Sequence, residues 1–481
     1  MIVEDCMSGS HAHVPQWVQD AVFYQIFPDR FQSSGQNAHG MVFSRWGTTP
    51  TGSNYMGGDL NGITAHIPYL SELGITAIYL TPIFSSASNH RYHTDDYYNV
   101  DPLLGGNAAL RMLLDTAHAA GIKVVLDGVF NHCGRGFYPF HHLVEHGADS
   151  PYRHWFYVES LPLAPYDESK PAGYAAWWDI RALPKLNVSH PPVRQFLLDV
   201  ARHWIEFGID GWRLDVPNEI ADHDFWREFR QVVKQANPEA YIVGEIWDDA
   251  TPWLDGTQFD AVMNYPVRTL ATGFFATRTT SAMDFSAGLE SEVARYRPEH
   301  TSAQYNVIGS HDTERFLTLA EGRVERLKLA MFFLMTYVGA PSIYYGDEIG
   351  LVGGKDPLNR ACFPWNRDVW NEELREWVRN CISLRQSFAS LRRGTLVMLH
   401  ARDSSRTVAF ARRHGRETML VVLNASDNDA SIDMLLSSLN IEDEMLLHDQ
   451  LSTRSYTVQN QSVRSVKVPA NGAALLMLSR R

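Results

Sequence analysis

Four short segments of the chain each run from apolar residues into ionisable ones. The acidic side chains at these places are Asp127, Asp215, Glu245 and Asp312. A buried parallel strand normally keeps an uninterrupted apolar run, so a carboxylate at its end is out of place unless that end opens onto a site. Chemical groups at the carboxyl ends of several strands are typical of an eight-stranded α/β barrel. We therefore predict that the four carboxylates share one site at the mouth of a barrel.

Asp215 and Glu245 are one strand–helix–strand unit apart, so they should end neighbouring strands and face each other. Two facing carboxylates suit glycoside hydrolysis, in which one attacks or stabilises the anomeric carbon and the other protonates the leaving oxygen. Arg213 should point to the same side as Asp215 and keep it ionised. The residues around Glu245, among them Trp247, predict apolar surroundings that keep it protonated. Asp312 adds a third acid, suited to holding sugar hydroxyls and to stabilising positive charge on the ring.

A simpler alternative is that these carboxylates form structural ion pairs at a barrel rim. For one carboxylate alone, a structural role would be at least as good an explanation as a catalytic one. Three carboxylates, with Arg213, His132 and His311 at the same end, favour catalysis. Aromatic residues are abundant, and flat rings can carry sugars. Those in predicted loops near the mouth are Tyr92, Tyr97, Tyr98, Trp177, Trp178, Trp247 and Trp365. Each one, taken singly, is better explained by packing.

The bulk composition narrows the class of protein. The 481 residues are 45% apolar and 20% charged, as in ordinary globular proteins, and the net charge of -13 argues against nucleic acid as a partner. We find no apolar run long enough to span a membrane and no signal peptide in the polar tail, residues 1–16. The four cysteines lack a CxxC spacing and are expected to be reduced thiols, which fits a cytoplasmic location.

Strand and helix patterns alternate from about Val22 to about Leu391, which predicts a mostly parallel sheet flanked by helices. Eight strands favour a closed (β/α)8 TIM barrel over a doubly wound sheet. We expect strands at 23–27, 77–84, 123–130, 211–216, 240–246, 261–265, 306–310 and 342–345. We expect helices at 107–120, 193–207, 225–237, 324–337 and 372–390.

Two segments depart from this alternation. Residues 133–188, after the third strand, are too long for a simple connection and predict an inserted domain over the barrel mouth. Residues 392–481 hold short strand patterns separated by Gly, Asn and Asp, which predict a C-terminal antiparallel β-sandwich domain. The barrel would then consist of residues 17–132 and 189–391.

Asn131, Asp95 and Asp96 could supply oxygen ligands to calcium. Capping and turn roles explain these residues better, and no dense Asp/Asn/Gly loop of the EF-hand type is present. We therefore expect no metal and no cofactor.

The chain resembles the α-amylase family, glycoside hydrolase family 13, from about Trp17 to its end. Its signatures stand in order as DGVFNH (127–132), GWRLDV (211–216), GEIW (244–247) and IGSHDT (308–313). The resemblance implies a retaining enzyme with Asp215 as nucleophile, Glu245 as acid/base and Asp312 as stabiliser of the transition state. It also implies that the cleaved glucosyl unit is held by Tyr92, His132, Arg213 and His311. Asp127 would support Arg213, and residues 133–188 and 392–481 would be the family's domains B and C.

LPKLN (183–187) and DVPNE (215–219) are similar to segments of the neopullulanase, cyclomaltodextrinase and maltogenic amylase group. By this resemblance Asn218, Glu219 and Trp247 would lie on the acceptor side and favour transglycosylation. Asp356 and Arg360 would bind the next sugar toward the non-reducing end. The expected substrates are cyclodextrins and maltooligosaccharides, with pullulan and starch left open. A glucanotransferase, an ordinary α-amylase and a non-catalytic sugar-binding protein remain as alternatives.

Members of that group usually carry an N-terminal β domain through which they dimerise. Here the barrel pattern begins within about twenty residues of Met1, which favours a monomer. The loop after the first strand also lacks the Asn/Asp-rich pattern that binds calcium in several members of the family.

Overall fold

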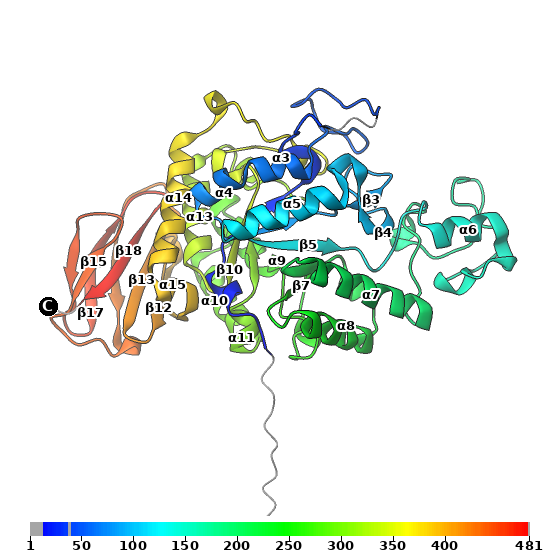
Figure 1. Ribbon diagram of the computed structural model, residues 1–481. Helices are drawn as coiled ribbons and strands as arrows, with labels where there is room; N and C mark the ends of the chain where they lie inside the picture. Colours follow the sequence, from blue (N-terminus) through cyan, green and yellow to red (C-terminus); the bar gives the residue numbers. More distant parts are fainter. Residues whose placement is uncertain (1–12, 37–39, 480–481) are drawn as a thin grey trace, which may run out of the picture.

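The computed structural model describes residues 13–36 and 40–479, so most of the predicted tail, residues 1–16, lies outside the described residues (Figure 1). Eight parallel strands pair in the order β8-β7-β6-β5-β2-β1-β10-β9. They are β1 (Phe23–Ile26), β2 (Ala77–Leu80), β5 (Lys123–Gly128), β6 (Gly211–Leu214), β7 (Tyr241–Gly244), β8 (Ala261–Val262), β9 (Tyr305–Val307) and β10 (Ala340–Tyr344). A parallel bridge between Met263 and Tyr305 joins the two ends of the sheet. The predicted TIM barrel is therefore confirmed.

The barrel strands are apolar because both of their faces are covered. Tyr79 and Val125 belong to the core inside the barrel. Their neighbours along the strands, Ile78 and Leu126, belong to the core between the strands and the helices. Since successive side chains of a strand point to opposite faces, an uninterrupted apolar run fills both cores.

A helix that covers the barrel with one apolar face is well illustrated by α7 (Pro191–Phe207). In α7, Val193, Leu197, Ala201 and Trp204 recur at helical spacing and are buried, and Gly208 ends the helix with φ 110°. The others around the barrel are α1 (Trp17–Asp20), α2 (Pro28–Phe31), α3 (Leu60–Ala65), α4 (Ile67–Leu73), α5 (Gly106–Ala119), α8 (His223–Ala236), α9 (Tyr265–Ala271), α10 (Ala282–Arg295), α11 (Pro298–Thr301), α12 (Phe316–Leu319), α13 (Val324–Thr336), α14 (Glu372–Ser387) and α15 (Ala389–Arg393).

Several predicted elements have the wrong extent, and three of them run into the next element of the structure. The helix expected at 372–390 is two helices, because Phe388 between α14 and α15 has an extended backbone (φ -113°, ψ 117°). The strand expected at 261–265 ends at Val262, and α9 begins at Tyr265. The strand expected at 77–84 ends at Leu80, after which β3 (Phe84–Ser86) pairs with β4 (Thr94–Val100) in an antiparallel ribbon.

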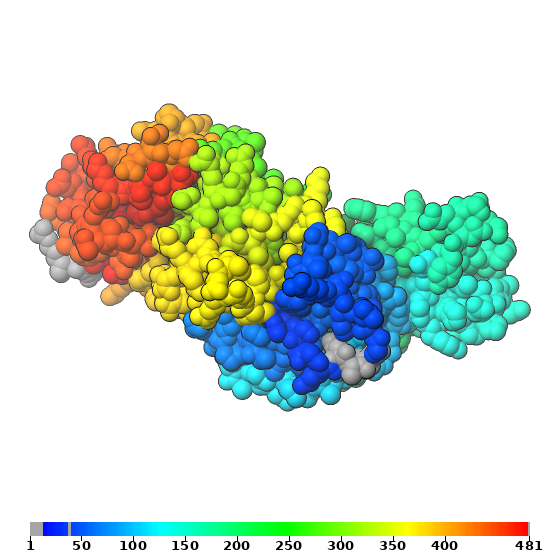
Figure 2. Space-filling view, turned by 90° about the horizontal axis from the view of Figure 1, so that it is seen from above, coloured from blue at the N-terminus to red at the C-terminus, as the bar shows by residue number. Residues whose placement is uncertain are grey.

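Residues 133–188 follow β5 and form a lobe at one end of the molecule (Figures 1 and 2). The lobe contains α6 (Tyr138–His146) and the short 3-10 helices η2 (Gly147–Asp149), η3 (Arg153–Trp155) and η4 (Trp177–Asp179), and isolated bridges join its turns. One bridge, between His132 and Lys185, ties the return of this segment to the end of β5. The lobe therefore meets the barrel at the strand ends that carry the predicted site.

The C-terminal strands lie at the opposite end (Figure 2). They are β11 (Thr395–Arg402), β12 (Thr407–His414), β13 (Glu417–Asn424), β14 (Ala430–Leu435), β15 (Leu446–Asp449), β16 (Ser455–Thr457), β17 (Ser462–Val468) and β18 (Gly472–Ser479). A six-stranded antiparallel sheet, β11-β12-β13-β18-β15-β16, shares one apolar core with the pair β14-β17. The predicted antiparallel β architecture is confirmed. No helix among the described residues is long and apolar enough to cross a membrane.

Candidate active site

Arg213 on β6 lies at the centre of the predicted site and is 1% exposed. Its Nη1 donates to Asp127 Oδ1 and to Asp215 Oδ1, each at 2.9 Å. Its Nη2 lies 2.7 Å from Glu245 Oε2. One guanidinium thus gathers carboxylates from the ends of β5, β6 and β7, which are neighbours in the barrel. Arg213 and Asp215 point to the same side, as the two-residue spacing predicts.

Asp127 is held by several donors at once. Besides Arg213, it accepts hydrogen bonds from Tyr79 Oη at 2.5 Å and from Tyr92 Oη at 2.9 Å. Its carboxylate is 2% exposed and has no room for a sugar. These contacts fit a residue that fixes Arg213 and Tyr92 in place. Tyr79 was not predicted to belong to the site, because a tyrosine inside an apolar strand gives no sign of a polar task.

His311 and Asp312 follow β9 and meet Tyr92 from the other side. Gln25 Nε2 donates to His311 Nδ1 at 2.6 Å, which leaves His311 Nε2 to donate to Tyr92 Oη at 2.5 Å. Asp312 Oδ2 is 3.2 Å from His311 Nε2. Burial lowers the pKa of His311 well below its usual value, so the imidazole is neutral. A hydrogen-bonded chain therefore runs from Gln25 through His311 and Tyr92 to Asp127.

His132 faces the nucleophile candidate. Its Nε2 lies 3.9 Å from Asp215 Oδ2 and has no hydrogen-bond partner among the described residues. Burial lowers the pKa of His132 to about 3, so this ring is neutral as well. A neutral, buried ring nitrogen aimed into the site is suited to a sugar hydroxyl.

Three aspartates of the site, Asp127, Asp215 and Asp312, hold protons more tightly than an isolated aspartate does. Burial raises the pKa of Asp215 well above its usual value, and Arg213 opposes that rise without cancelling it. The expectation that Arg213 keeps Asp215 ionised is met in the sign of its effect, which lowers the pKa of Asp215, but not in its size, because burial outweighs it. Burial, followed by the charge of Glu245, raises the pKa of Asp312 to about 7. Asp127, Asp215 and Asp312 thus interact with one another around one buried arginine, and burial raises the pKa of each.

Glu245 has polar surroundings, not the apolar ones predicted. Beside Arg213, its Oε2 accepts from the backbone N–H of Val216 at 3.2 Å, and its Oε1 accepts from Trp247 Nε1 at 3.1 Å. Trp247 stacks on Tyr265, with ring centroids 3.6 Å apart and planes at 5°, and stays 44% exposed. The indole therefore orients Glu245 and also offers an open face.

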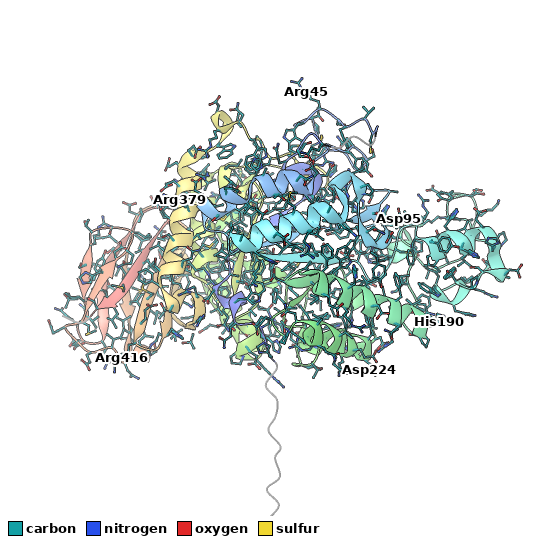
Figure 3. All side chains as sticks on the ribbon, in the orientation of Figure 1. Arg45, Asp95, His190, Asp224, Arg379 and Arg416 are labelled. Atoms are coloured by element: carbon teal, nitrogen blue, oxygen red, sulfur yellow. The ribbon has the colours of Figure 1, made fainter. Side chains whose placement is uncertain are left out.

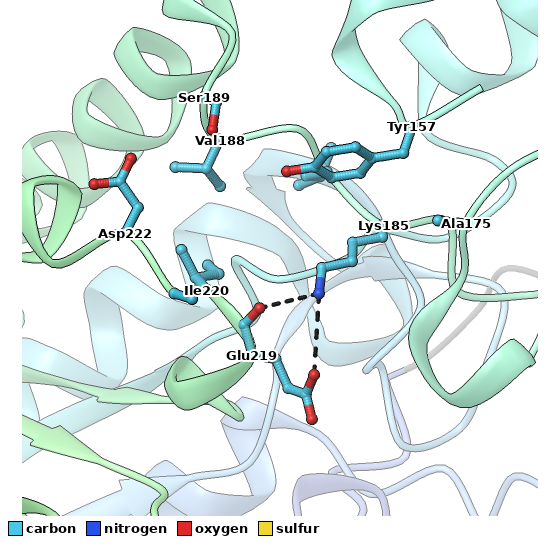
Figure 4. A pocket seen from close by; sticks show the side chains of 10 residues that line it. Tyr157, Ala175, Lys185, Val188, Ser189, Glu219, Ile220 and Asp222 are labelled. Atoms are coloured by element: carbon cyan, nitrogen blue, oxygen red, sulfur yellow. Dashed lines mark hydrogen bonds and ion pairs between the residues drawn. The ribbon is translucent and has the colours of Figure 1, made fainter. Parts of the chain in front are cut away.

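Asn218 and Glu219 lie in the turn after β6, on the side of the inserted lobe. Lys185 Nζ donates to the Glu219 carbonyl at 3.0 Å and lies 3.9 Å from Glu219 Oε2. Lys185 and Glu219 border a pocket of about 490 Å³ that Tyr157 and Asp222 also line (Figure 4). Lys185 belongs to the LPKLN segment, but its contact with Glu219 could not be predicted from the sequence alone.

Arg360 brings the predicted donor-side residues to the site. Its Nη1 lies 3.1 Å from Asp356 Oδ1 and its Nη2 lies 3.6 Å from Asp312 Oδ1. Arg360 Nε also donates to the His311 carbonyl at 3.0 Å. Asn359, which the sequence did not single out, donates to the same carbonyl at 2.7 Å and fixes this loop.

Of the three residues considered for calcium, Asp96 has partners in the protein, whereas Asp95 Oδ1 and Asn131 Oδ1 are buried without a hydrogen-bond partner among the described residues. Asp95 lies on β4 near the junction of barrel and lobe (Figure 3), where burial raises its pKa to about 6. Asp96 accepts from the Tyr98 backbone N–H and from Asn99 Nδ2, both at 2.8 Å. Within residues 13–36 and 40–479, no three His, Cys, Asp or Glu side chains are grouped to hold a metal ion.

Comparison with known proteins shows which family the chain resembles. A family model described as the α-amylase catalytic domain matches residues 25–409. A cyclomaltodextrinase from Geobacillus thermopakistaniensis (strain MAS1) is 47% identical over 422 residues, 87% of this chain and 71% of the relative. The crystal structure of Ttha1563 from Thermus thermophilus has a TM-score of 0.91 at 47% identity, covering 96% of this chain and 100% of the other. A cyclic α-maltosyl-(1→6)-maltose hydrolase from Arthrobacter globiformis has a TM-score of 0.88 at 38% identity, covering 97% and 100%.

A closed barrel with acidic strand ends around one buried arginine, and with these relatives, defines a glycoside hydrolase. The chain belongs to the α-amylase family. The resemblance and the enzyme class predicted from the sequence are both confirmed, and hydrolysis of α-glucans is the activity that the relatives support.

Proposed function

We propose that the protein is a retaining hydrolase of α-1,4 bonds in cyclodextrins and maltooligosaccharides, with Asp215 as nucleophile and Glu245 as acid/base. One observation carries the proposal: Arg213 holds Asp215 and Glu245 on adjacent strands, 2.9 and 2.7 Å from its own nitrogens. That arrangement presents two carboxyl groups to one bond, as double-displacement hydrolysis requires.

The hydrogen bonds assign separate tasks to the atoms of Asp215. Its Oδ1 is occupied by Arg213, so Oδ2 is the oxygen free to attack the anomeric carbon. Glu245 gives its proton to the leaving glycosidic oxygen as that bond breaks, and the sugar becomes bonded to Asp215. Glu245 then takes a proton from water, which attacks the anomeric carbon and releases Asp215. Asp312 stabilises the positive charge of both transition states.

The residues around this pair would hold the sugar ring. His132 Nε2 and Asp312 border the same space as Asp215 Oδ2 and present groups that bond hydroxyls. Tyr92 lies parallel to His311, with planes at 7°, which fixes both rings before substrate arrives. Such preorganisation lowers the cost of orienting the substrate.

One observation supports a cyclic α-glucan as substrate, and another supports transfer to acceptors. Two of the relatives, the cyclomaltodextrinase and the cyclic α-maltosyl-(1→6)-maltose hydrolase, are named for cyclic glucans. The pocket beside Lys185 and Glu219 offers room for an acceptor sugar, so some transfer to acceptors should accompany hydrolysis (Figure 4). A glucanotransferase is the second candidate, and the same pocket is the observation that favours it.

Product profiling on β-cyclodextrin, pullulan and soluble starch, side by side, tests the substrate. Faster cleavage of β-cyclodextrin than of starch is expected, and the reverse order would make the protein an ordinary α-amylase. Mostly transfer products at low donor concentration would favour the transferase. Asp215→Asn and Glu245→Gln should each lower turnover by roughly 10⁴-fold or more. Near-normal turnover in either variant would refute the assignment of the pair.

A further inference from the structure

Two adjacent tryptophans of the inserted lobe continue the site outward. Trp177 stacks on His132, with ring centroids 5.5 Å apart and planes at 24°. Trp178 stacks on Trp177, with centroids 4.6 Å apart and planes at 13°. Because His132 Nε2 lies 3.9 Å from Asp215 Oδ2, three stacked rings lead from the nucleophile candidate to the surface of the lobe.

Packing does not explain Trp178. Its side chain is 75% exposed, so it buries little apolar area. Among the described residues, Trp177 is the one ring that lies against it, which leaves its other face open.

The backbone beneath this indole is strained. Trp178 has φ 48° and ψ 35°, and Asp179 has φ 58°, so two successive residues with side chains occupy the left-handed region. Such a conformation persists only where its surroundings enforce it, and it is concentrated at functional sites. Here the Trp177 N–H donates to the Leu183 carbonyl at 3.0 Å, and the Leu183 N–H donates to the Ile180 carbonyl at 2.8 Å. The turn at Trp177 and Trp178 is therefore fixed with an aromatic face turned to solvent.

We propose that the open face of Trp178 binds a glucosyl ring of the substrate that is remote from the bond being cleaved. The inference rests on the proposed function, because the ligand is the same α-glucan. The apolar face of a pyranose matches one indole in size and chemistry. Two protein rings separate this face from Asp215, so the sugar on Trp178 differs from the sugar on the nucleophile. A protein partner would need about 800 Å² of surface, far more than one ring provides.

The test compares a long and a short substrate. We expect Trp178→Ala to lower the ratio of kcat/KM for maltoheptaose to kcat/KM for maltotriose by about tenfold, the effect of losing one well-covered aromatic contact. Trp178→Phe should keep most of that ratio, because a flat ring remains. Tyr138→Ala is the matched control: Tyr138 is also an aromatic residue of the lobe and is 61% exposed, but it packs on His142 and Tyr152. Its ratio should not change.

Two further measurements make the outcome decisive. Trp178→Gly suits the left-handed backbone, so it should fold even if Trp178→Ala does not, and it should show the same loss of ratio. Calorimetric binding of maltoheptaose, measured in the Asp215→Asn background, should weaken about tenfold with either variant. If folded variants keep the ratio of kcat/KM for maltoheptaose to kcat/KM for maltotriose, whether both values stay the same or both fall equally, Trp178 does not bind a remote glucosyl ring. If Asp215→Asn still turns over substrate, the proposed function is wrong. The ratio of the two kcat/KM values, measured with Asp215 intact, still tests the role of Trp178 in that case.

Discussion

Asp312 links the chemistry of the site to the stability of the fold. Burial, next to the charge of Glu245, raises its pKa to about 7, whereas an aspartate in the unfolded chain titrates near 3.8. The folded protein therefore binds this proton more tightly than the unfolded chain. By linkage, stability falls as pH rises from about 4 to about 7, and that loss is complete above pH 7. Asp312→Asn, which carries no titrating group there, should escape this loss.

The size of the effect follows from the width of that window. A shift of about three units is worth up to about 4 kcal/mol. The side chain of Asp312 is 26% exposed, and part of its shift comes from the charge of Glu245, so we expect about 2 kcal/mol. At pH 8 the free energy of unfolding of Asp312→Asn should exceed that of the parent by about 2 kcal/mol, and at pH 4 the two values should be equal. The variant should also lose most of its activity.

Urea unfolding at pH 4, 5.5, 7 and 8.5 measures this difference directly. Asp224→Asn is the control, because Asp224 lies at the surface of α8 (Figure 3) with 80% of its side chain exposed. Its free energy of unfolding should follow that of the parent within about 0.5 kcal/mol throughout. A difference for Asp312→Asn that is independent of pH, or one that favours the parent as pH rises, would refute the reasoning.

Three other changes probe separate parts of the site. Trp247→Phe removes the indole N–H that donates to Glu245 Oε1 but keeps an aromatic ring. We expect kcat to fall about tenfold and the pH profile of activity to shift. An unchanged pH profile would count against the role of Trp247 in orienting Glu245. Lys185→Met removes the contact of Lys185 with Glu219 and should alter the ratio of transfer to hydrolysis, measured by chromatography of the products. A constant ratio would show that the pocket does not bind the acceptor. Burial lowers the pKa of His132 to about 3, so His132→Asn should lower kcat yet keep both limbs of the pH profile between pH 4 and 9, and loss of a limb would contradict a neutral ring.

Much of the fold follows from patterns that a single chain displays. Eight apolar runs alternating with amphipathic helices predict the barrel, because both faces of a parallel sheet must be covered. Short elements were harder to predict: β8 has two residues, too few to show a strand pattern, and Asn264 and Pro266 mark the start of α9 only three residues into the predicted strand. The break between α14 and α15 depends on an extended Phe388 backbone, for which the sequence shows no proline or glycine.

The site was predictable to the extent that it lies at strand ends. Carboxylates after apolar runs stand out, so Asp127, Asp215 and Glu245 were found from the chain alone. Their hydrogen bonds were not, because the partners come from strands far apart in sequence. Gln25 and Tyr79 sit inside buried strands and become visible as site residues only when the barrel closes around Arg213. The roles of single residues, the cytoplasmic location and the absence of a metal or cofactor remain predictions.

The central claim, that Asp215 forms a covalent bond to the sugar, is tested most directly by trapping that bond. Glu245→Gln cannot activate water, yet an activated donor such as maltosyl fluoride needs no proton on its leaving group. Incubation of this variant with that donor, followed by proteolysis and mass spectrometry, should place a maltosyl adduct on the peptide that contains Asp215. An adduct on Asp127 or Asp312, or turnover to a product of inverted configuration without any adduct, would contradict the account.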